Sequence, residues 1–355
     1  MAMTVSLDQA ALAVRTIGAS NTIILRGEPG IGKSAILKML AKQMPDYRMC
    51  YIDCANLDLG DVAMPVIDRE LMVTNYAPNA RFGVGKGQTS PVAIMLDELG
   101  KSSRSVLNML LPTILEHRIG DVPFPTGSIV FATTNLDTDG VGDNIPAHAY
   151  NRMTEMIVRK ATPKEMIQYG ADNGWAPEIL TFIRQQPDVL DSYVDLKAND
   201  KNPYIFNPLT GNVRNFCSPR SLEKASNIIN VRNVLGDVAL PSLVGTLGEA
   251  AARQMDALVN LADQLPLYEN IVAKPDTVKI PDGVGALFIL AFMLAGRVGQ
   301  NDMDEVMTYV KRVAGESFEA AALCVTSIAS NNSKVGWASR NRKFQELSAS
   351  YGKYF

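Results

Sequence analysis

The sequence has 355 residues, of which 47% are hydrophobic and 20% are charged, and its net charge is −3. A chain of this length is too long for one comfortable core, so we expect two packed units. The absence of a basic excess argues against a protein that wraps nucleic acid. The most apolar stretch, 284–295, is shorter than the roughly 20 residues of a membrane span and is predicted to be a buried helix.

The cysteine content predicts a reducing compartment. The four cysteines are expected to be buried free thiols, because a metal site would need more ligands than they and the two histidines of the chain provide. Residues 1–10 have neither a basic region nor a long apolar run, so they do not resemble a secretion signal. These features predict a cytoplasmic protein. The cysteines are Cys50, Cys54, Cys217 and Cys324.

Residues 27–34 match G-x-x-x-x-G-K-S, the P-loop pattern. The apolar run 22–25 before them predicts a strand, and 35–41 after them predicts a helix, which favours a phosphate site over a chance glycine-rich turn. We expect Lys33 to reach the β- and γ-phosphates of ATP and Ser34 to ligate Mg²⁺. The remaining residues of the loop, which would surround the phosphates with backbone N–H groups, are Gly27, Glu28, Pro29, Gly30, Ile31 and Gly32.

A second motif is the apolar run 91–96, which ends in Asp97 and Glu98. Downstream of a P-loop, a strand with this ending is the Walker B pattern, in which the aspartate holds the hydration shell of Mg²⁺. The adjacent glutamate can polarise the attacking water. The alternative is a strand followed by a surface turn that happens to carry two acids.

The elements around these motifs indicate a parallel sheet. We predict helices over 6–17 and 102–118, the second bent at Pro112, strands over 48–53, 128–135 and 156–158, and a hairpin arm over 119–124. Two segments are predicted to lack regular structure: a polar connection over 58–66 and a mobile glycine-rich loop over 75–90. Alternating strands and helices predict an α/β fold with a five-stranded parallel sheet. Asn135 would then emerge at the same edge as Ser34 and Asp97.

Several stretches resemble motifs of the AAA+ ATPases, and within them of the MoxR-like group that includes the CbbQ-type activators. Besides the P-loop and Walker B, 129–135 is similar to the sensor 1 strand, 147–153 to the arginine-finger segment and 217–223 to the sensor 2 motif. The segment 115–124 resembles the hairpin before sensor 1. Residues 99–101, Leu-Gly-Lys, depart from the Ile/Leu-Asn-Arg that MoxR-like proteins often carry after Walker B.

This resemblance implies roles for three further residues. Asn135 would orient the lytic water or read the γ-phosphate, and Arg220 would contact the nucleotide from a lid helix. Arg152 would reach into the site of a neighbouring subunit, which implies a homo-oligomeric ring, expected to be a hexamer. The alternative for each arginine is a surface salt bridge.

The second half of the sequence predicts an α-helical lid. We expect an AAA+ α/β subdomain over 1–160, the lid over 161–315 with a loop insertion near 195–216, and a helical extension over 316–355. Helices are predicted over 163–173, 221–230, 240–258, 283–297 and 302–313, and Trp175 is expected in the core. A basic cluster near the end is either a solvated face or a partner contact; it contains Lys334, Arg340, Arg342 and Lys343.

The sequence therefore predicts an ATPase that remodels or activates a protein partner, which the resemblance suggests could carry a von Willebrand A domain. Whether the 75–90 loop lines a pore stays open. Two alternatives also stay open: an ATPase that acts on nucleic acid, against which the acidic charge counts, and a nucleotide-dependent scaffold with slow turnover.

Overall fold

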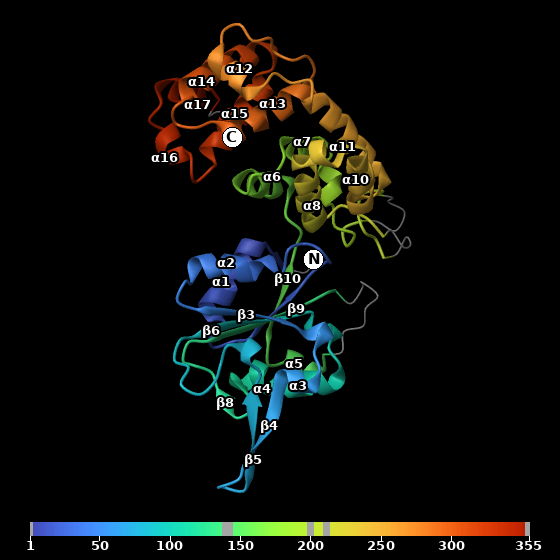
Figure 1. The fold of residues 1–355 in the computed structure, drawn as a ribbon, viewed down its shortest axis with the longest axis vertical. Helices are drawn as coiled ribbons and strands as arrows, with labels where there is room; N and C mark the ends of the chain where they lie inside the picture. Colours follow the sequence, from blue (N-terminus) through green and yellow to red (C-terminus); the bar gives the residue numbers. More distant parts are fainter. Residues whose placement is uncertain (1–2, 137–144, 197–201, 209–213, 352–355) are drawn as a thin grey trace. The chain divides into compact units, whose positions relative to one another are not determined.

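The computed structural model describes residues 3–136, 145–196, 202–208 and 214–351 (Figure 1). The chain divides into two compact units, Met1–Lys160 and Ala161–Phe355. All strands of the described chain lie in the first unit, whereas the second contains helices and loops. The predicted α/β fold with a helical region after it is confirmed.

A six-stranded sheet forms the centre of the first unit, and its neighbouring strands all pair in parallel. The strand order is β1-β10-β2-β9-β6-β3. The prediction of five strands is wrong because β1 has only two residues, which are too few to show a strand pattern. The strands are β1 (Thr4–Val5), β2 (Ile23–Arg26), β3 (Arg48–Asp53), β6 (Val92–Asp97), β9 (Ile129–Thr134) and β10 (Thr154–Val158).

Helices cover both faces of this sheet, as the alternation along β9 shows. Ile129 and Phe131 pack in a cluster with α1 and α2, and Val130 and Ala132 pack in another with α4. Cover on both faces explains why β6 and β9 are buried at every position and are mostly apolar. The helices of this unit are α1 (Leu7–Ile17), α2 (Ala35–Gln43), α3 (Leu59–Val62), α4 (Arg104–Glu116) and α5 (Ala147–Tyr150).

Helix α4 has a favourable N-cap and an unusual C-cap. The Ser103 hydroxyl accepts a hydrogen bond from the backbone N–H of Val106, which is a standard N-cap. Pro112 lies inside the helix, as predicted. The helix ends at His117, whose φ of 48° is left-handed, a conformation that glycine and asparagine adopt more easily.

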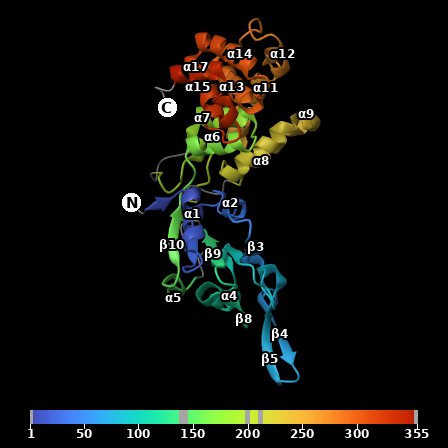
Figure 2. The same ribbon diagram turned by 90° about the vertical axis from the view of Figure 1, so that its left-hand side faces the viewer.

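Two hairpins extend from the first unit, and the longer one was not predicted. Strands β4 (Ala63–Asp68) and β5 (Val73–Pro78) pair antiparallel and project away from the sheet in both views (Figures 1 and 2). The predicted polar connection over 58–66 and loop over 75–90 are therefore wrong in part. The apolar side chains of this hairpin face solvent, so the pattern of a half-buried strand is missing. The shorter hairpin, β7 (Arg118–Ile119) with β8 (Val122–Pro123), is confirmed.

The second unit contains the predicted helices with one correction. The helix expected over 240–258 is two helices, because the chain breaks at Gly248 with a φ of 85°. A Cβ at this position would lie 2.7 Å from the carbonyl oxygen of Asn215, so a side chain does not fit. The helices are α6 (Pro163–Asp172), α7 (Pro177–Gln185), α8 (Pro219–Asn230), α9 (Arg232–Leu235), α10 (Ala239–Leu247), α11 (Glu249–Ala262), α12 (Tyr268–Ala273), α13 (Val284–Arg297), α14 (Met303–Glu316), α15 (Phe318–Ala329), α16 (Val335–Ala338) and α17 (Arg342–Tyr351).

The described part of 316–355 shares a core with the helices before it. Side chains of α15 and α17 pack in one hydrophobic cluster with those of α12, α13 and α14. Lys334 is not part of a solvated basic face, because its Nζ donates to the carbonyl oxygens of Ala295, Gly296 and Val298 at 2.7, 2.7 and 3.0 Å. The predicted insertion near 195–216 lies partly outside the described residues; its described residues form no helix or strand.

Both tryptophans of the chain lie in the second unit. Trp175 is buried, as predicted, and Trp337 packs against the cluster of α12 to α17. All four cysteines are buried free thiols, as predicted. Among the described residues, no helix is long and apolar enough to cross a membrane.

Candidate functional site

The P-loop follows β2 and leads into α2, and its glycines are required by geometry. Gly30 and Gly32 have φ values of 78° and 102°, which favour glycine. A Cβ at Gly27 would lie 2.7 Å from the carbonyl oxygen of Val158. The loop therefore passes close to the end of β10, and residues with side chains do not fit at these positions.

Lys33 is held at this loop by three hydrogen bonds. Its Nζ donates to the carbonyl oxygens of Gly27 and Glu28 at 2.5 and 3.0 Å, and to Oδ1 of Asn135 at 3.1 Å. The structure thus brings together the predicted P-loop lysine and the predicted sensor residue, which are 102 positions apart in the chain.

Asp97, the last residue of β6, accepts hydrogen bonds on both carboxylate oxygens. Oδ2 accepts from Ser34 Oγ at 3.0 Å and from the Tyr51 hydroxyl at 2.8 Å. Oδ1 accepts from the Thr133 hydroxyl. Burial, and then the hydrogen bond to Asp97, raise the pKa of Tyr51, so its hydroxyl remains a donor at neutral pH.

Glu98 has an unusual backbone conformation at the end of the same strand. Its φ of 54° and ψ of 39° are left-handed, which is uncommon for a residue other than glycine and clusters at functional sites. Its N–H donates to Thr133 Oγ1 at 3.2 Å. Its carboxylate forms a partly exposed ion pair with Lys101 at 2.8 Å, in the turn where the sequence departs from the MoxR-like pattern.

The register of the sheet explains why these side chains meet. Arg26, just before the P-loop, is paired with Thr134, just before Asn135. Asp97 is paired with Asp53 at the end of β3. The carboxyl ends of β2, β3, β6 and β9 therefore lie at one edge of the sheet, which is where parallel α/β sheets bind ligands.

A buried ion pair connects the P-loop to the segment just after β10. Lys160 Nζ lies 2.9 Å from Oε2 of Glu28, and the two side chains are only 6% and 7% exposed. Glu28 was predicted as a loop residue, but this pairing was not, because it joins residues far apart in the sequence.

The structure places the two predicted arginines in different units of the chain. Arg152 follows α5, is exposed, and forms no ion pair with the residues that the structure describes. Arg220 belongs to the second unit, where it is the second residue of α8 and is also exposed.

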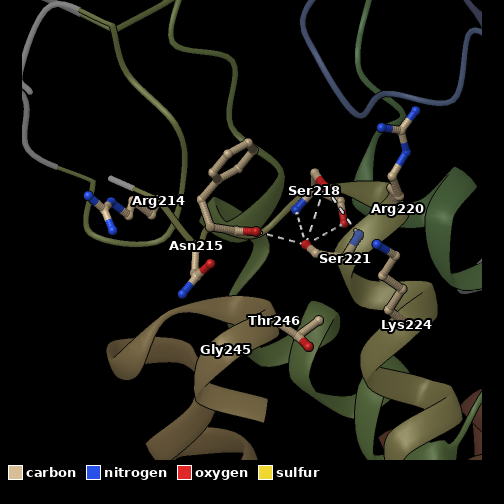
Figure 3. A pocket seen from close by; sticks show the side chains of 9 residues that line it. Arg214, Asn215, Ser218, Arg220, Ser221, Lys224, Gly245 and Thr246 are labelled. Atoms are coloured by element: carbon tan, nitrogen blue, oxygen red, sulfur yellow. Dashed lines mark hydrogen bonds between the residues drawn. The ribbon is translucent and has the colours of Figure 1, made fainter. Parts of the chain in front are cut away.

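Arg220 lines a hollow of about 220 Å³ within the second unit (Figure 3). Arg214 and Lys224 lie around the same hollow, so three cations share its rim. The segment before α8 is fixed by Ser221, whose hydroxyl donates to the carbonyl oxygen of Phe216 at 2.8 Å. Ser218 also caps the helix. The lining of the hollow therefore includes three basic side chains beside a well-ordered helix start.

Sequence reasoning missed Tyr51 and Thr133. Tyr51 lies two residues before Asp53, the last residue of β3, and Thr133 lies two residues before Asn135, the residue that follows β9. A search for polar residues two positions before these strand ends could have found them.

The residues of the cluster fit a magnesium nucleotide. The Ser34 hydroxyl and the Asp97 carboxylate are oxygen donors 3.0 Å apart, which is the chemistry that Mg²⁺ prefers. In the P-loop, the glycines leave the backbone N–H groups free of neighbouring Cβ atoms. The loop also carries the buried cation of Lys33. Among the described residues, no group of three or more histidine, cysteine, aspartate or glutamate side chains could hold another metal.

Comparison with known proteins agrees with this geometry. Residues 23–160 match the family model described as "ATPase family associated with various cellular activities (AAA)". A search of curated proteins found no match.

Solved structures with some likeness include a putative ATPase from Cytophaga hutchinsonii (15% identity, 93% of this chain and 91% of that one, TM-score 0.34). Another is the RuvB Holliday junction branch migration motor of Thermotoga maritima (16%, 87% and 85%, TM-score 0.36). A third is NtrX from Brucella abortus in complex with ADP (12%, 98% and 70%, TM-score 0.35).

Proposed function

We propose that this chain, which carries an AAA-family domain over residues 23–160, is an ATPase that works as a ring and remodels or activates a protein partner. One observation supports hydrolysis above the others. Lys33, Ser34, Asp97 and Asn135 converge at a single edge of the sheet, linked by hydrogen bonds of 3.0 to 3.1 Å. This combination supplies a cation, two metal ligands and a polar sensor within one site.

Each residue has a distinct role in this proposal. Lys33 binds the β- and γ-phosphates, and Ser34 and Asp97 hold Mg²⁺, which when bound neutralises charge on the phosphates. Asn135 orients a water toward the γ-phosphorus, and Glu98 polarises this water. A bond forms from the water oxygen to phosphorus while the bond to the bridging oxygen breaks, and ADP and phosphate result.

Arginines would complete the site from outside this unit. The exposure of Arg152 supports a role in the site of a neighbouring subunit, where its charge stabilises the transferring phosphoryl group and is typically worth about 10³–10⁵ in rate. Such a role requires a ring, which we propose to be a hexamer. Arg220 would contact the nucleotide from α8 and couple the nucleotide state to the helical region.

The exposed hairpin supports a protein as the partner rather than nucleic acid. Its strands and turn expose large apolar side chains, and Met72 is 85% exposed. With one arginine against two acids, residues 63–78 offer no basic surface for phosphates. Contiguous exposed apolar surface marks interaction sites for proteins. The exposed side chains are Met64, Val66, Ile67, Leu71, Met72, Val73 and Tyr76.

We extend the proposal to the MoxR-like group. The β7–β8 hairpin directly before β9 supports it, since a hairpin before sensor 1 is part of the resemblance. The partner would then be a protein that could carry a von Willebrand A domain.

Two variants test the ATPase. We expect Lys33→Ala to lose binding of a fluorescent ADP analogue, because the loop loses its cation. We expect Glu98→Gln to bind the nucleotide like the wild type but to release phosphate about 10²–10⁴ times more slowly, because the water is no longer polarised.

Lys38→Ala is the matched control, since Lys38 is an exposed lysine on α2, and it should change neither property. Undiminished phosphate release by Glu98→Gln would remove Glu98 from the mechanism. A rate that rises on addition of DNA would favour the nucleic-acid alternative instead.

A further inference from the structure

Tyr51 makes an unusual contact for a half-exposed residue. The residue is 52% exposed, yet its hydroxyl donates to Oδ2 of Asp97 at 2.8 Å and makes no other hydrogen bond with the described residues. A tyrosine at a surface normally keeps its hydroxyl in water. The contact therefore fixes the hydroxyl at the metal-binding carboxylate.

The contact follows from the register of the two strands. Tyr51 on β3 is paired with Met95 on β6, so Asp97 is the diagonal neighbour on the same face of the sheet. The tyrosine side chain is long enough to bring its hydroxyl to this neighbour. Because both strands lie within the sheet, the position of the hydroxyl is set by rigid elements rather than by a loop.

The hydrogen bonds of Asp97 leave Tyr51 with a distinct role. A carboxylate has about four acceptor positions, and hydroxyl groups of Thr133, Ser34 and Tyr51 occupy three of them. Ser34 is itself a proposed ligand of Mg²⁺, and Thr133 also accepts from the N–H of Glu98. Tyr51 is the donor on Oδ2 with no second function.

We propose that Tyr51 is a positioning residue that holds the Asp97 carboxylate ready for Mg²⁺. The inference rests on the proposed function, since it concerns the same metal site. A carboxylate that is already oriented loses less conformational freedom when the cation binds, so the metal binds more tightly. Tyr51 itself touches neither the nucleotide nor the reacting atoms in this proposal.

The test is a Mg²⁺ titration of the affinity for mant-ADP, a fluorescent ADP analogue. Tyr51→Phe keeps the ring and removes the hydroxyl. We expect it to raise the Mg²⁺ concentration at half-effect about 3- to 10-fold, the range for a lost hydrogen bond, and to leave the affinity in EDTA unchanged. Tyr47→Phe is the matched control, because the Tyr47 hydroxyl donates to the carbonyl oxygen of Gly127 at 3.0 Å, away from Asp97. It should leave both values unchanged.

A double-variant cycle shows whether the effect passes through the carboxylate. In an Asp97→Asn background, Tyr51→Phe should have no further effect on the Mg²⁺ requirement. An equal effect in that background, or an unchanged or lowered Mg²⁺ requirement in Tyr51→Phe alone, would overturn the inference. A wild type whose mant-ADP binding ignores Mg²⁺ would instead contradict the proposed function.

Discussion

The ion pair between Glu28 and Lys160 makes the P-loop sensitive to a residue outside it. Removing one partner of a buried pair leaves a charge in a region of low dielectric and typically costs about 3–5 kcal/mol. We expect Lys160→Met to lower the free energy of unfolding of the first unit by roughly this amount, measured by urea denaturation with circular dichroism.

Arg81→Met is the control, because Arg81 pairs with Asp61 at 2.8 Å on the surface of the same unit, where such pairs contribute about 0–1 kcal/mol. The double variant Glu28→Gln/Lys160→Met should recover part of the loss, since neither charge is then buried. Equal losses of unfolding free energy in Lys160→Met and Arg81→Met would show that the Glu28–Lys160 pair stabilises the protein no more than a surface ion pair does.

For single residues, the sequence predicts those that lie within motifs, but it does not predict the contacts that they make between strands. The spacing of the P-loop and the paired acids identifies Lys33, Asp97 and Glu98 directly. The contacts of Tyr51 and Lys160 depend instead on strand order and register, which single-sequence patterns do not contain. The left-handed conformation of Glu98 is likewise visible only in the folded chain.

Among the elements, α4 carries a titratable residue at its end. Burial lowers the pKa of His117 below its ordinary value of 6.5, although a hydrogen bond with the backbone of Ser128 opposes this shift. Between the lowered folded pKa and the unfolded pKa, the unfolded chain binds more protons than the folded one. The contribution of neutral His117 to the free energy of unfolding is therefore complete above about pH 6.5. It is lost as the pH falls through the pKa that His117 has in the folded protein.

His117→Asn tests this dependence, because asparagine does not titrate and tolerates the left-handed conformation. We expect the variant to lose less stability than the wild type between about pH 7.5 and pH 5.5, measured as the shift of the urea midpoint. If both proteins lose the same stability over this interval, His117 does not contribute to the pH dependence.

Elements were predicted well where one face or both faces are buried. Strands β6 and β9 begin with continuous apolar runs because helices cover both sides of the sheet. The β4–β5 hairpin was missed because its apolar side chains face solvent and Pro65 interrupts one strand. The break between α10 and α11 depends on the approach of Asn215 to Gly248, a tertiary contact.

For the whole molecule, the switch from strands to helices in the sequence lies near the division between Lys160 and Ala161. The number of subunits has no comparable signal in the chain, since a ring is needed only if Arg152 acts in trans. A mixing experiment addresses this point directly.

We expect Arg152→Ala and Glu98→Gln to be inactive alone and to recover activity when mixed. A subunit with Arg152→Ala keeps its own Glu98 and receives Arg152 from a Glu98→Gln neighbour. Chance assembly at equal amounts gives intact junctions at about one quarter of positions, so phosphate release should approach about one quarter of the wild-type rate.

A mixture of Lys33→Ala with Glu98→Gln is the control, because every site then contains a defect regardless of its neighbour. It should stay inactive. No recovery with Arg152→Ala, in samples shown by light scattering to form mixed oligomers, would argue against a role in trans.

Because both tryptophans lie in the second unit, tryptophan fluorescence reports the unfolding of that unit alone. Excitation near the red edge of the protein absorption band selects indole over tyrosine, so the emission comes from Trp175 and Trp337 in the second unit. A ligand that binds only the folded first unit raises its stability by mass action. An indole signal that follows this rise reports that the two units melt together, and a signal that does not follow it reports that they melt separately.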